Sequence, residues 1–582
     1  MGGVPNARAS DADHMKFHRI AIVCALAVVV VAPGVSARAE SSLHDTHIVM
    51  SDGVALVGDV DLPPGNGPFP VILQLTPYGR LTYTTAYVAD GFAHVNVDVR
   101  GTGRSAGVNC ITCAREQDDV VEVIEWVARQ PWSTGNVGMI GGSYSAFLQL
   151  LAAAKQPPAL KAIVPRAAWS DPYRDGWYQN GLFNQSVVAA FSGFQPAAGA
   201  TGISTDPALL PPLVNRPQNP TPLELALAHP FDDDFYKERA IYNKYDRITV
   251  PALFVGGWFD MFTAGTIRNF NGVASVEKRL IMGPWTHRRA GGLAETFPEP
   301  YPDVYWPGPD PILQWYEHYV AGIDNGVERE PRVQSYDVGT SEWTASDRWP
   351  LPGTSLVDLH LSGEASGSIE SLHDGTLAAR APHDPASLTP DSYLYDPTSG
   401  VAQTTSNDNA VFLTPFHRFD QRVDEMRSIT YTTAALDAPI ELAGPIELDA
   451  WVSTTATDAD IVVKVSDVGP DGTSLLLTSG FVRLSQRTVD TGRSKPGQPW
   501  LRNDERATVP QSTPVHVRVP IDPVDTTLTS GHRLRISISS ADVVVHQPLA
   551  APSVNTILHD RGHPSTLLVS VTGVRRWPSV LK

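Results

Sequence analysis

The chain has 582 residues, and because about one domain per 150 residues is usual, its length excludes a single small module. Apolar residues make up 42% of the sequence and charged residues 18%, a composition that can form large hydrophobic cores. The formal net charge is -18, and no block of Lys and Arg is present that could follow a phosphate backbone. We therefore expect no nucleic acid among its partners.

The first 39 residues have the layout of a secretory signal peptide. A basic segment around Lys16 precedes an apolar run from Ile20 to Val31 and the small-residue site Ala37-Arg38-Ala39. The alternative is a membrane anchor, but such a helix needs roughly 20 apolar residues, and this run is shorter. We predict cleavage near Glu40, no stable membrane insertion afterwards, and a secreted or extracytoplasmic location.

Short apolar runs rich in branched residues predict buried strands in the first 350 residues. Helical patterns lie between them, and the clearest begins at Asp118 and ends before Gln130. Alternating strands and helices predict a mostly parallel sheet covered on both faces, so the expected fold class is α/β, over residues 40–165 and 250–349. The predicted strands are Val71–Leu75, His94–Val99, Val137–Ile140, Ala162–Val164, Ala252–Val255 and Leu280–Met282.

Two stretches break this alternation. Residues 166–249 combine aromatic residues and Pro-rich turns with short helical segments, which indicates a helical cap inserted into the α/β domain. Residues 350–582 alternate with period 2, as in Leu534-Ile536-Ile538, and turn signals such as Asp471-Gly472 separate the runs. Many short alternating strands predict an all-β jelly roll or sandwich as the C-terminal domain.

The segment around Ser143 has the features of a nucleophile elbow. An apolar strand runs into Gly141-Gly142-Ser143-Tyr144-Ser145 and then into a helical pattern. A serine on such a turn needs small neighbours, and the helix N-terminus places the Tyr144 N–H beside a developing oxyanion. Ser145 stands where glycine is usual, so the alternative is a structural turn serine.

A serine hydroxyl becomes an effective nucleophile when a histidine, held by a carboxylate, accepts its proton. Asp260 and His287 each follow a predicted strand through a Trp-containing loop, and the order Ser, Asp, His is that of α/β-hydrolases. We predict Ser143 as the nucleophile, His287 as the base and Asp260 as the acid that orients it. Because the chain has 17 histidines, the alternative for His287 is a packed residue.

A second glycine-rich motif, Gly101 to Ala106, follows a predicted strand and has the G-x-G-x-x-[GA] spacing of a dinucleotide-binding loop. Such a loop must lead at once into a helix, whereas here residues 107–110 continue as loop. The acidic residue Asp118 also stands at a helix start instead of after a second strand. We therefore expect no nicotinamide cofactor.

Of the three cysteines, Cys24 lies in the predicted signal peptide, which leaves Cys110 and Cys113. In an exported protein a C-x-x-C pair favours a disulfide, with two free thiols as the alternative. A zinc site would need a second ligand pair at comparable spacing, and none is visible. We expect the reaction to need no metal and no cofactor.

Five motifs in this order resemble those of the cocaine esterase and X-Pro dipeptidyl-peptidase family of serine hydrolases, over about Asp45 to the C-terminus. The resemblance implies an α/β-hydrolase domain with an inserted helical cap and a C-terminal jelly roll. It also implies that the Tyr78 hydroxyl joins the Tyr144 amide in the oxyanion hole and that Trp177 lies in the acyl pocket. The motifs are Thr76-Pro77-Tyr78-Gly79, Asp98-Val99-Arg100-Gly101, Gly141-Gly142-Ser143-Tyr144, Gly257-Trp258-Phe259-Asp260 and Gly283-Pro284-Trp285-Thr286-His287.

The function expected is therefore an exported serine hydrolase that cleaves a small-molecule ester, or an amide, through an acyl-enzyme. The alternatives are an X-Pro dipeptidyl aminopeptidase, a β-lactam acylase and, in another class, a secreted binding protein with an inert hydrolase domain. Met261-Phe262-Thr263 follow Asp260, where relatives that act on α-amino esters carry acidic residues, and this argues against such substrates. A homodimer is one of the assemblies that the sequence leaves open.

Overall fold

The computed structural model describes residues 41–80, 87–189, 191, 219–287, 309–369, 373–384, 387–397, 420–542, 545–573 and 577. The predicted signal peptide lies outside these residues. None of the helices among the described residues is both long and apolar enough to cross a bilayer.

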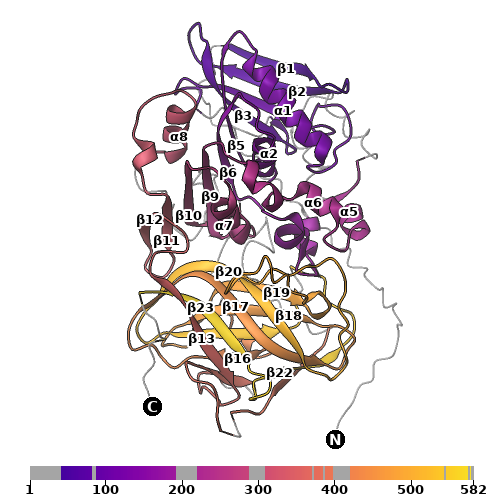
Figure 1. The fold of residues 1–582 in the computed structure, drawn as a ribbon, viewed down its shortest axis with the longest axis vertical. Coiled ribbons are helices and arrows are strands. Elements are labelled where there is room, and N and C mark those ends of the chain that lie inside the picture. The colour runs from indigo at the N-terminus through magenta and orange to yellow at the C-terminus, as the bar shows by residue number, and fades with distance from the viewer. Residues whose placement is uncertain are drawn as a thin grey trace, which may run out of the picture. The chain divides into compact units, whose positions relative to one another are not determined.

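The α/β domain is built on a sheet in which ten strands are described (Figure 1). Seven neighbouring strands are parallel, in the order β4-β3-β5-β6-β9-β10-β11. Every strand predicted for this domain is present. These strands are β3 (Phe69–Thr76), β4 (Ala93–Asp98), β5 (Ser133–Gly142), β6 (Leu160–Arg166), β9 (Ala252–Phe259) and β10 (Lys278–Thr286).

Strands at the two ends of the sheet were not among those predicted. β1 (Ser41–Val49) and β2 (Ala55–Leu62) are antiparallel at one end, and β11 (Val333–Asp337) pairs with antiparallel β12 (Glu342–Ser346) at the other. The residues of the edge strands β1 and β12 are mostly exposed or half-buried, and few of them are apolar. They therefore lack the continuous apolar runs by which the central strands were recognised.

Helices cover both faces of the sheet. α1 (Ala114–Ala128), α2 (Tyr144–Ala153) and α7 (Thr263–Gly272) contribute to one apolar core, and α8 (Pro311–Tyr319) to the other. Successive residues of β5 alternate between these cores, because Met139 lies in the first and Ile140 in the second. Figure 1 shows β5, β6 and β9 between α8 and α2.

The start of α1 differs from the prediction. The helix begins at Ala114, about one turn before Asp118, and ends at Ala128 as expected. Asp119 is buried and binds Arg100, with its Oδ1 2.7 Å from an Arg100 guanidinium nitrogen. Asp119 therefore forms an ion pair with a residue outside the helix, and it does not mark the helix N-terminus.

The described part of the insertion between β6 and β9 consists of short elements, as the sequence predicted. The π-helix η2 (Pro172–Trp177) leads into the short hairpin β7 (Tyr178–Gln179) and β8 (Leu182–Phe183). After residue 219 come α5 (Pro222–Ala228), α6 (Asp234–Arg239) and the 3-10 helix η4 (Tyr242–Arg247). A capping box between Thr221 and Glu224 begins α5.

The C-terminal domain is all-β, as predicted, and its sheet returns on itself because β23 pairs with both β13 and β17. Its apolar core is formed by alternate residues of these strands. The strands are β13 (Thr354–Ser362), β14 (Asp374–Ala378), β15 (Asp391–Tyr395), β16 (Ile429–Thr432), β17 (Ile440–Thr454), β18 (Asp460–Val468), β19 (Ser474–Arg483), β20 (Val515–Leu528), β21 (Arg533–Ser539), β22 (Ser553–Leu558) and β23 (Thr566–Thr572).

Candidate active site

Ser143 lies on the sharp turn between β5 and α2. Its φ and ψ are 56° and -123°, a conformation that is costly for a residue with a side chain and occurs mainly at functional sites. The Ser143 amide donates to the Arg166 carbonyl at 3.0 Å, and the Ser143 carbonyl accepts from the Ala146 amide at 2.8 Å. These two hydrogen bonds hold the turn in its strained form.

The small residues around Ser143 are required by close packing. Gly141 has a φ of 136°, and a Cβ atom at this position would lie 2.4 Å from the Cβ of Ser145. Ser145 itself is buried, and its hydroxyl has no hydrogen-bond partner among the described residues. The turn therefore accepts serine at position 145, where glycine is usual, but needs glycine at 141.

Tyr78 reaches the same point from β3. Its hydroxyl donates to Ser143 Oγ at 3.3 Å and also forms a hydrogen bond with the Tyr144 backbone amide. Burial raises the pKa of Tyr78, although these two hydrogen bonds oppose the rise. The phenol therefore stays neutral and keeps its proton to donate.

His287 and Asp260 form a hydrogen-bonded pair. The Nδ1 atom of His287 lies 3.0 Å from Oδ1 of Asp260, which also accepts the Phe262 amide at 2.8 Å. The Phe262 ring meets the imidazole edge-on, with 5.1 Å between ring centroids. Both members of the pair are buried. The imidazole is thus oriented by one carboxylate and one aromatic ring.

Each of these four residues follows the carboxyl end of a parallel strand. Tyr78 follows β3, Ser143 follows β5, Asp260 follows β9, and His287 follows β10. The ends of parallel strands lie at one edge of a sheet, and open α/β sheets hold their sites there. The strand-end argument was made from the sequence for Ser143, Asp260 and His287, and the positions of these three residues agree with it.

Trp177 lies at the end of η2 within the insertion. It is buried, and its ring contacts Phe235 and Tyr236, with centroid distances of 5.7 and 5.9 Å. Its indole N–H has no hydrogen-bond partner among the described residues. The place of Trp177 in an acyl pocket stays a prediction.

A second tryptophan, Trp169, was not predicted and lies in the aromatic packing beside His287. Its ring stacks on Phe147 of α2 with 3.5 Å between centroids, and it meets Phe262 edge-on at 5.8 Å. Phe262 is the ring that contacts His287. The available signal was an aromatic residue three positions after the carboxyl end of β6, at the sheet edge that holds the site.

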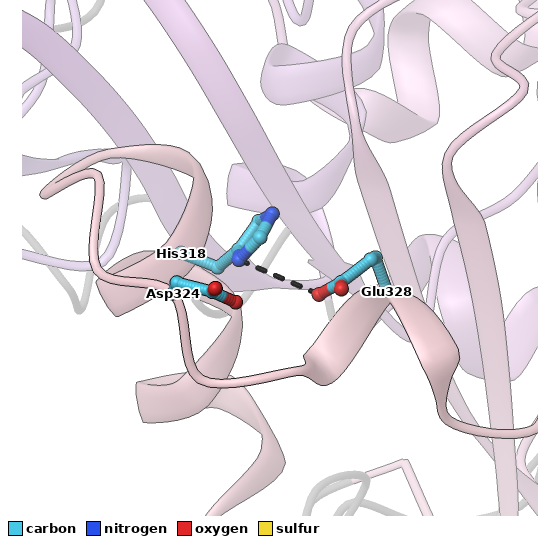
Figure 2. Close-up of side chains that lie close together, drawn as sticks. All are labelled: His318, Asp324 and Glu328. Carbon is cyan, nitrogen blue, oxygen red and sulfur yellow. Dashed lines mark ion pairs between the residues drawn. The ribbon is translucent and has the colours of Figure 1, made fainter.

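Two groups of potential metal ligands occur among the described residues, and neither includes a predicted site residue. His318, Asp324 and Glu328 form the first, where His318 Nδ1 lies 3.6 Å from Glu328 Oε2 (Figure 2). The second is a set of carboxylates where β11 meets β17 and β20, namely Asp337, Glu441 and Asp525. Neither group takes part in the chemistry considered below.

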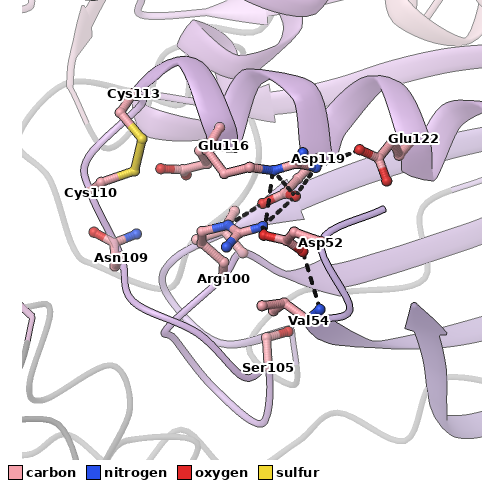
Figure 3. Close-up of polar contacts among 12 residues, drawn as sticks. Asp52, Val54, Arg100, Ser105, Asn109, Cys110, Cys113, Glu116, Asp119 and Glu122 are labelled. Atoms are coloured by element: carbon pink, nitrogen blue, oxygen red, sulfur yellow. Dashed lines mark hydrogen bonds and ion pairs between the residues drawn. A yellow bond between two sulfur atoms is a disulfide. The ribbon is translucent and has the colours of Figure 1, made fainter. Parts of the chain in front are cut away.

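Cys110 and Cys113 are joined by a disulfide just before α1 (Figure 3). One helical turn further, the buried carboxylate of Glu116 accepts the Tyr144 hydroxyl at 2.7 and 2.9 Å. The sequence analysis did not identify Glu116. Its only signal was an acidic residue near the start of an amphipathic helix, and such residues are common.

The parallel sheet, the serine elbow and the histidine–carboxylate pair define an α/β-hydrolase followed by an all-β domain. A family model described as X-Pro dipeptidyl-peptidase (S15 family) matches residues 52–289, and one described as X-Pro dipeptidyl-peptidase C-terminal non-catalytic domain matches residues 325–567. The chain therefore belongs to the cocaine esterase and X-Pro dipeptidyl-peptidase family, and it is a serine hydrolase.

Relatives that are named as esterases and relatives that are named as peptidases align with the chain. The cocaine esterase of a Rhodococcus species is 27% identical over 90% of this chain and 97% of its own length. A putative serine esterase of Mycobacterium bovis is 26% identical over 90% and 94%. A putative Xaa-Pro dipeptidyl-peptidase of Streptomyces avermitilis is 24% identical over 74% and 60%.

Solved structures share the two-domain fold. A CocE/NonD family hydrolase from Staphylococcus aureus superposes with a TM-score of 0.74 at 21% identity, covering 91% of this chain and 94% of that one. An α-amino acid ester hydrolase gives a TM-score of 0.72 at 20% identity, covering 95% of this chain and all of that one. At these identities the likeness establishes the fold.

Proposed function

We propose that the protein hydrolyses carboxylic esters through an acyl-enzyme formed on Ser143. The Ser143 Oγ bonds to the acyl carbon while its proton passes to His287. Collapse of the tetrahedral intermediate breaks the bond to the alcohol oxygen, which leaves with that proton. Water then attacks the acyl-enzyme by the same route and regenerates Ser143.

His287 serves as the base in this scheme because Asp260 holds it. Asp260 accepts the Nδ1–H at 3.0 Å, so the neutral imidazole carries its basic lone pair on Nε2. The buried carboxylate also stabilises the imidazolium that forms when the serine proton is transferred. Phe262 limits the rotation of the ring.

The observation that carries the proposal is the meeting of Tyr78, Ser143 and the Tyr144 amide. Two donors, the Tyr78 hydroxyl and the Tyr144 N–H, lie together beside the nucleophile. In a water-poor site such donors stabilise the negative charge that develops on the acyl oxygen. We assign them as the oxyanion hole.

Ester substrates are favoured over N-terminal Xaa-Pro peptides for a local reason. Met261 and Phe262, which follow Asp260, are buried and apolar, so they provide no carboxylate to bind a substrate ammonium group. Amide hydrolysis, as in an X-Pro dipeptidyl-peptidase or a β-lactam acylase, is the second candidate, because a putative Xaa-Pro dipeptidyl-peptidase is among the relatives that align with the chain.

A fluorophosphonate probe and a substrate panel test this proposal. The wild-type protein should be labelled at Ser143, and Ser143→Ala should be neither labelled nor active, since loss of the nucleophile costs about 10⁶ in turnover. Acyl esters should be cleaved faster than Xaa-Pro anilides. An unlabelled wild-type protein would leave an inert binding protein as the explanation, and a preference for the anilides would make it a peptidase.

The proposal also places the protein outside the cytoplasm. The disulfide between Cys110 and Cys113 supports this location, because disulfides persist mainly in oxidising compartments. Expressed in its full length, the protein should appear in the medium or the cell envelope with an N-terminus near Glu40. Full-length protein retained in the cytoplasm would contradict export.

A further inference from the structure

We propose that Glu116, held by the Cys110–Cys113 loop, is a positioning residue for the oxyanion hole. It anchors the phenol ring of Tyr144, and so orients the Tyr144 backbone N–H beside Ser143. The inference rests on the proposed function, because it assigns a role to that N–H in the reaction. It extends the candidate site to helix α1 and to the loop that precedes it.

The anchor is a buried hydrogen bond between two helices. Glu116 of α1 accepts the Tyr144 hydroxyl of α2 through both carboxylate oxygens, at 2.7 and 2.9 Å. Both residues are at most 1% exposed. The Asn109 side-chain amide also donates to the same hydroxyl at 3.4 Å. The Tyr144 ring is thus held at its far end while its backbone begins α2.

The carboxylate is itself held by the loop that precedes its helix. The Thr112 backbone amide donates to Glu116 Oε2 at 2.8 Å and lies 3.1 Å from the Tyr144 hydroxyl. Gln117 donates from its side chain to the Thr112 carbonyl at 2.8 Å. The loop backbone, the carboxylate and the tyrosine therefore form one buried network.

The loop has a conformation that it would not adopt alone. Ile111 and Thr112 have φ values of 54° and 56°, and left-handed backbone is costly for β-branched residues. The disulfide between Cys110 and Cys113 closes the loop around them. Arg239 binds from the cap side, donating to the carbonyls of Ile111 at 2.8 Å and Cys110 at 3.1 Å. Such strain persists only where surrounding contacts impose it.

The anchor matters because the Tyr144 N–H is at a helix N-terminus. The first amides of a helix have no intrahelical partner, so their direction depends on the residues around them. With the ring fixed, the amide keeps its direction toward the Tyr78 oxygen and the nucleophile. A loosened ring would let this peptide turn, and stabilisation of the transition state would fall while substrate binding changed little.

Glu116 also gives the network a proton-dependent element. Burial raises the pKa of Glu116 to about 7, while the hydrogen bonds from Tyr144 and Thr112 oppose the rise. Asp119 on the same helix raises this pKa further, and Arg239 of α6 lowers it. As a carboxylate, Glu116 accepts both hydrogen bonds, and once protonated it must use one oxygen as a donor.

Three variants test the anchor in the full-length protein. Glu116→Ala removes the acceptor and should lower kcat about 10- to 100-fold, with KM nearly unchanged. The fall in kcat should not exceed the fall that loss of one oxyanion donor causes. Glu116→Gln keeps an acceptor for Tyr144, so it should restore most of kcat. Glu122→Ala is the matched control, because Glu122 lies on the same helix as Glu116 (Figure 3) but binds Ser51 and Arg115. Its kcat should be that of wild type.

A double-mutant cycle separates anchoring from a general loss of packing. Tyr144→Phe removes the hydroxyl that Glu116 accepts, and the Glu116→Ala effect on kcat should largely vanish in that background. Additive effects, a wild-type kcat in Glu116→Ala, or an effect confined to KM would each overturn the proposal. Fluorophosphonate labelling of Glu116→Ala distinguishes failure of this proposal from failure of the proposed function, because labelling tests whether Ser143 is the nucleophile.

The role of the disulfide has its own test. Cys110→Ser/Cys113→Ser should lower kcat in the same direction as Glu116→Ala, again with little change in KM. Glu116→Ala added to the double-serine variant should cost less than it does in wild type, because the loop no longer holds the carboxylate. Wild-type kcat in the double-serine variant would remove the disulfide from the proposal.

Discussion

Tyr78 is the residue that most sharply distinguishes the proposed oxyanion hole from a backbone-only arrangement. Its hydroxyl lies 3.3 Å from Ser143 Oγ and forms a hydrogen bond with the Tyr144 backbone amide. The ring also packs edge-on against that of Tyr144, with 6.5 Å between centroids. A packing role and a catalytic role therefore overlap in one side chain, and only removal of the hydroxyl separates them.

Tyr78→Phe keeps the ring and removes the hydroxyl. If the hydroxyl stabilises the oxyanion, kcat on an activated aryl ester should fall by about 10² to 10³ while KM stays close to wild type. Steady-state kinetics measure both values, and thermal unfolding serves as the folding control. A fall in kcat of less than about tenfold would assign Tyr78 to packing.

At the scale of elements, the connection from β5 through Ser143 into α2 determines where the nucleophile lies. It depends on Gly141, which has a φ of 136°. A Cβ atom at this position would clash with the Cβ of Ser145. A side chain at this position would displace the turn, the N-terminus of α2, or both.

Gly141→Ala should therefore reduce activity more than it reduces stability. The clash and the backbone strain should cost roughly 1 to 3 kcal/mol of unfolding free energy. Displacement of Ser143 should cost at least about 10² in kcat, because reaction rates are sensitive to shifts of about 1 Å. Urea unfolding and ester kinetics measure the two effects.

Gly135→Ala is the control for this prediction. Gly135 has a φ of 84°, but a Cβ atom there would meet nothing closer than 3.8 Å. This variant carries the backbone strain without the clash and should retain wild-type kcat. Equal losses of activity in both variants would mean that strain alone, and not contact with Ser145, explains the requirement for glycine.

At the scale of the molecule, a buried arginine joins the insertion to the β-domain. Arg174 of η2 pairs with Asp171 and with Asp232, at 2.7 Å from the latter. It also donates to the carbonyls of Leu501 at 3.1 Å and Arg502 at 2.8 Å in the C-terminal domain. One side chain therefore links the insertion to the β-domain.

Arg174→Ala should destabilise the protein by about 3 to 5 kcal/mol, because it leaves buried carboxylates without their counter-charge. The expected readout is a lower urea midpoint for the full-length chain. Arg502→Ala is the control, since Arg502 is about half exposed and pairs with Asp504 at the surface. Equal shifts in the two variants would show that Arg174 contributes no more than a surface ion pair.

The junction of β11 with β20 makes stability depend on pH. Burial raises the pKa of Asp525 to about 7, and the nearby carboxylates of Asp337 and Glu441 add to the rise. The folded state thus binds this proton more tightly than the unfolded chain. The contribution of Asp525 to folding stability is fully present below about pH 4, the usual range of an aspartate pKa. It is lost as pH rises through about 7.

Asp525→Asn should therefore become more stable relative to wild type as pH increases. Asparagine can still accept the Ser335 hydroxyl, which binds the aspartate in the wild-type structure. Thermal unfolding at pH 5 and pH 8 measures the difference in Tm, which should shift in favour of the variant at pH 8. A difference that is the same at both pH values would contradict the raised pKa.

Apolar runs in the sequence predicted the central strands β3, β4, β5, β6, β9 and β10 of the α/β sheet and three of the residues at its carboxyl edge. Central parallel strands are buried on both faces, so they appear as apolar runs, and the residue after each run lies at the carboxyl edge. Ser143, Asp260 and His287 could be placed in this way. Tyr78 was assigned through the family resemblance, and its position after β3 agrees with that assignment.

The side chains that support that edge could be identified only from contacts in the folded chain. Glu116 and Tyr144 lie 28 positions apart, and Arg174 and Leu501 lie 327 positions apart. The start of α1 and the stacking of Trp169 on Phe147 depend in the same way on contacts between distant segments. Periodicity reports which face of an element is buried, but the partner on that face is set by packing, because apolar burial has no direction.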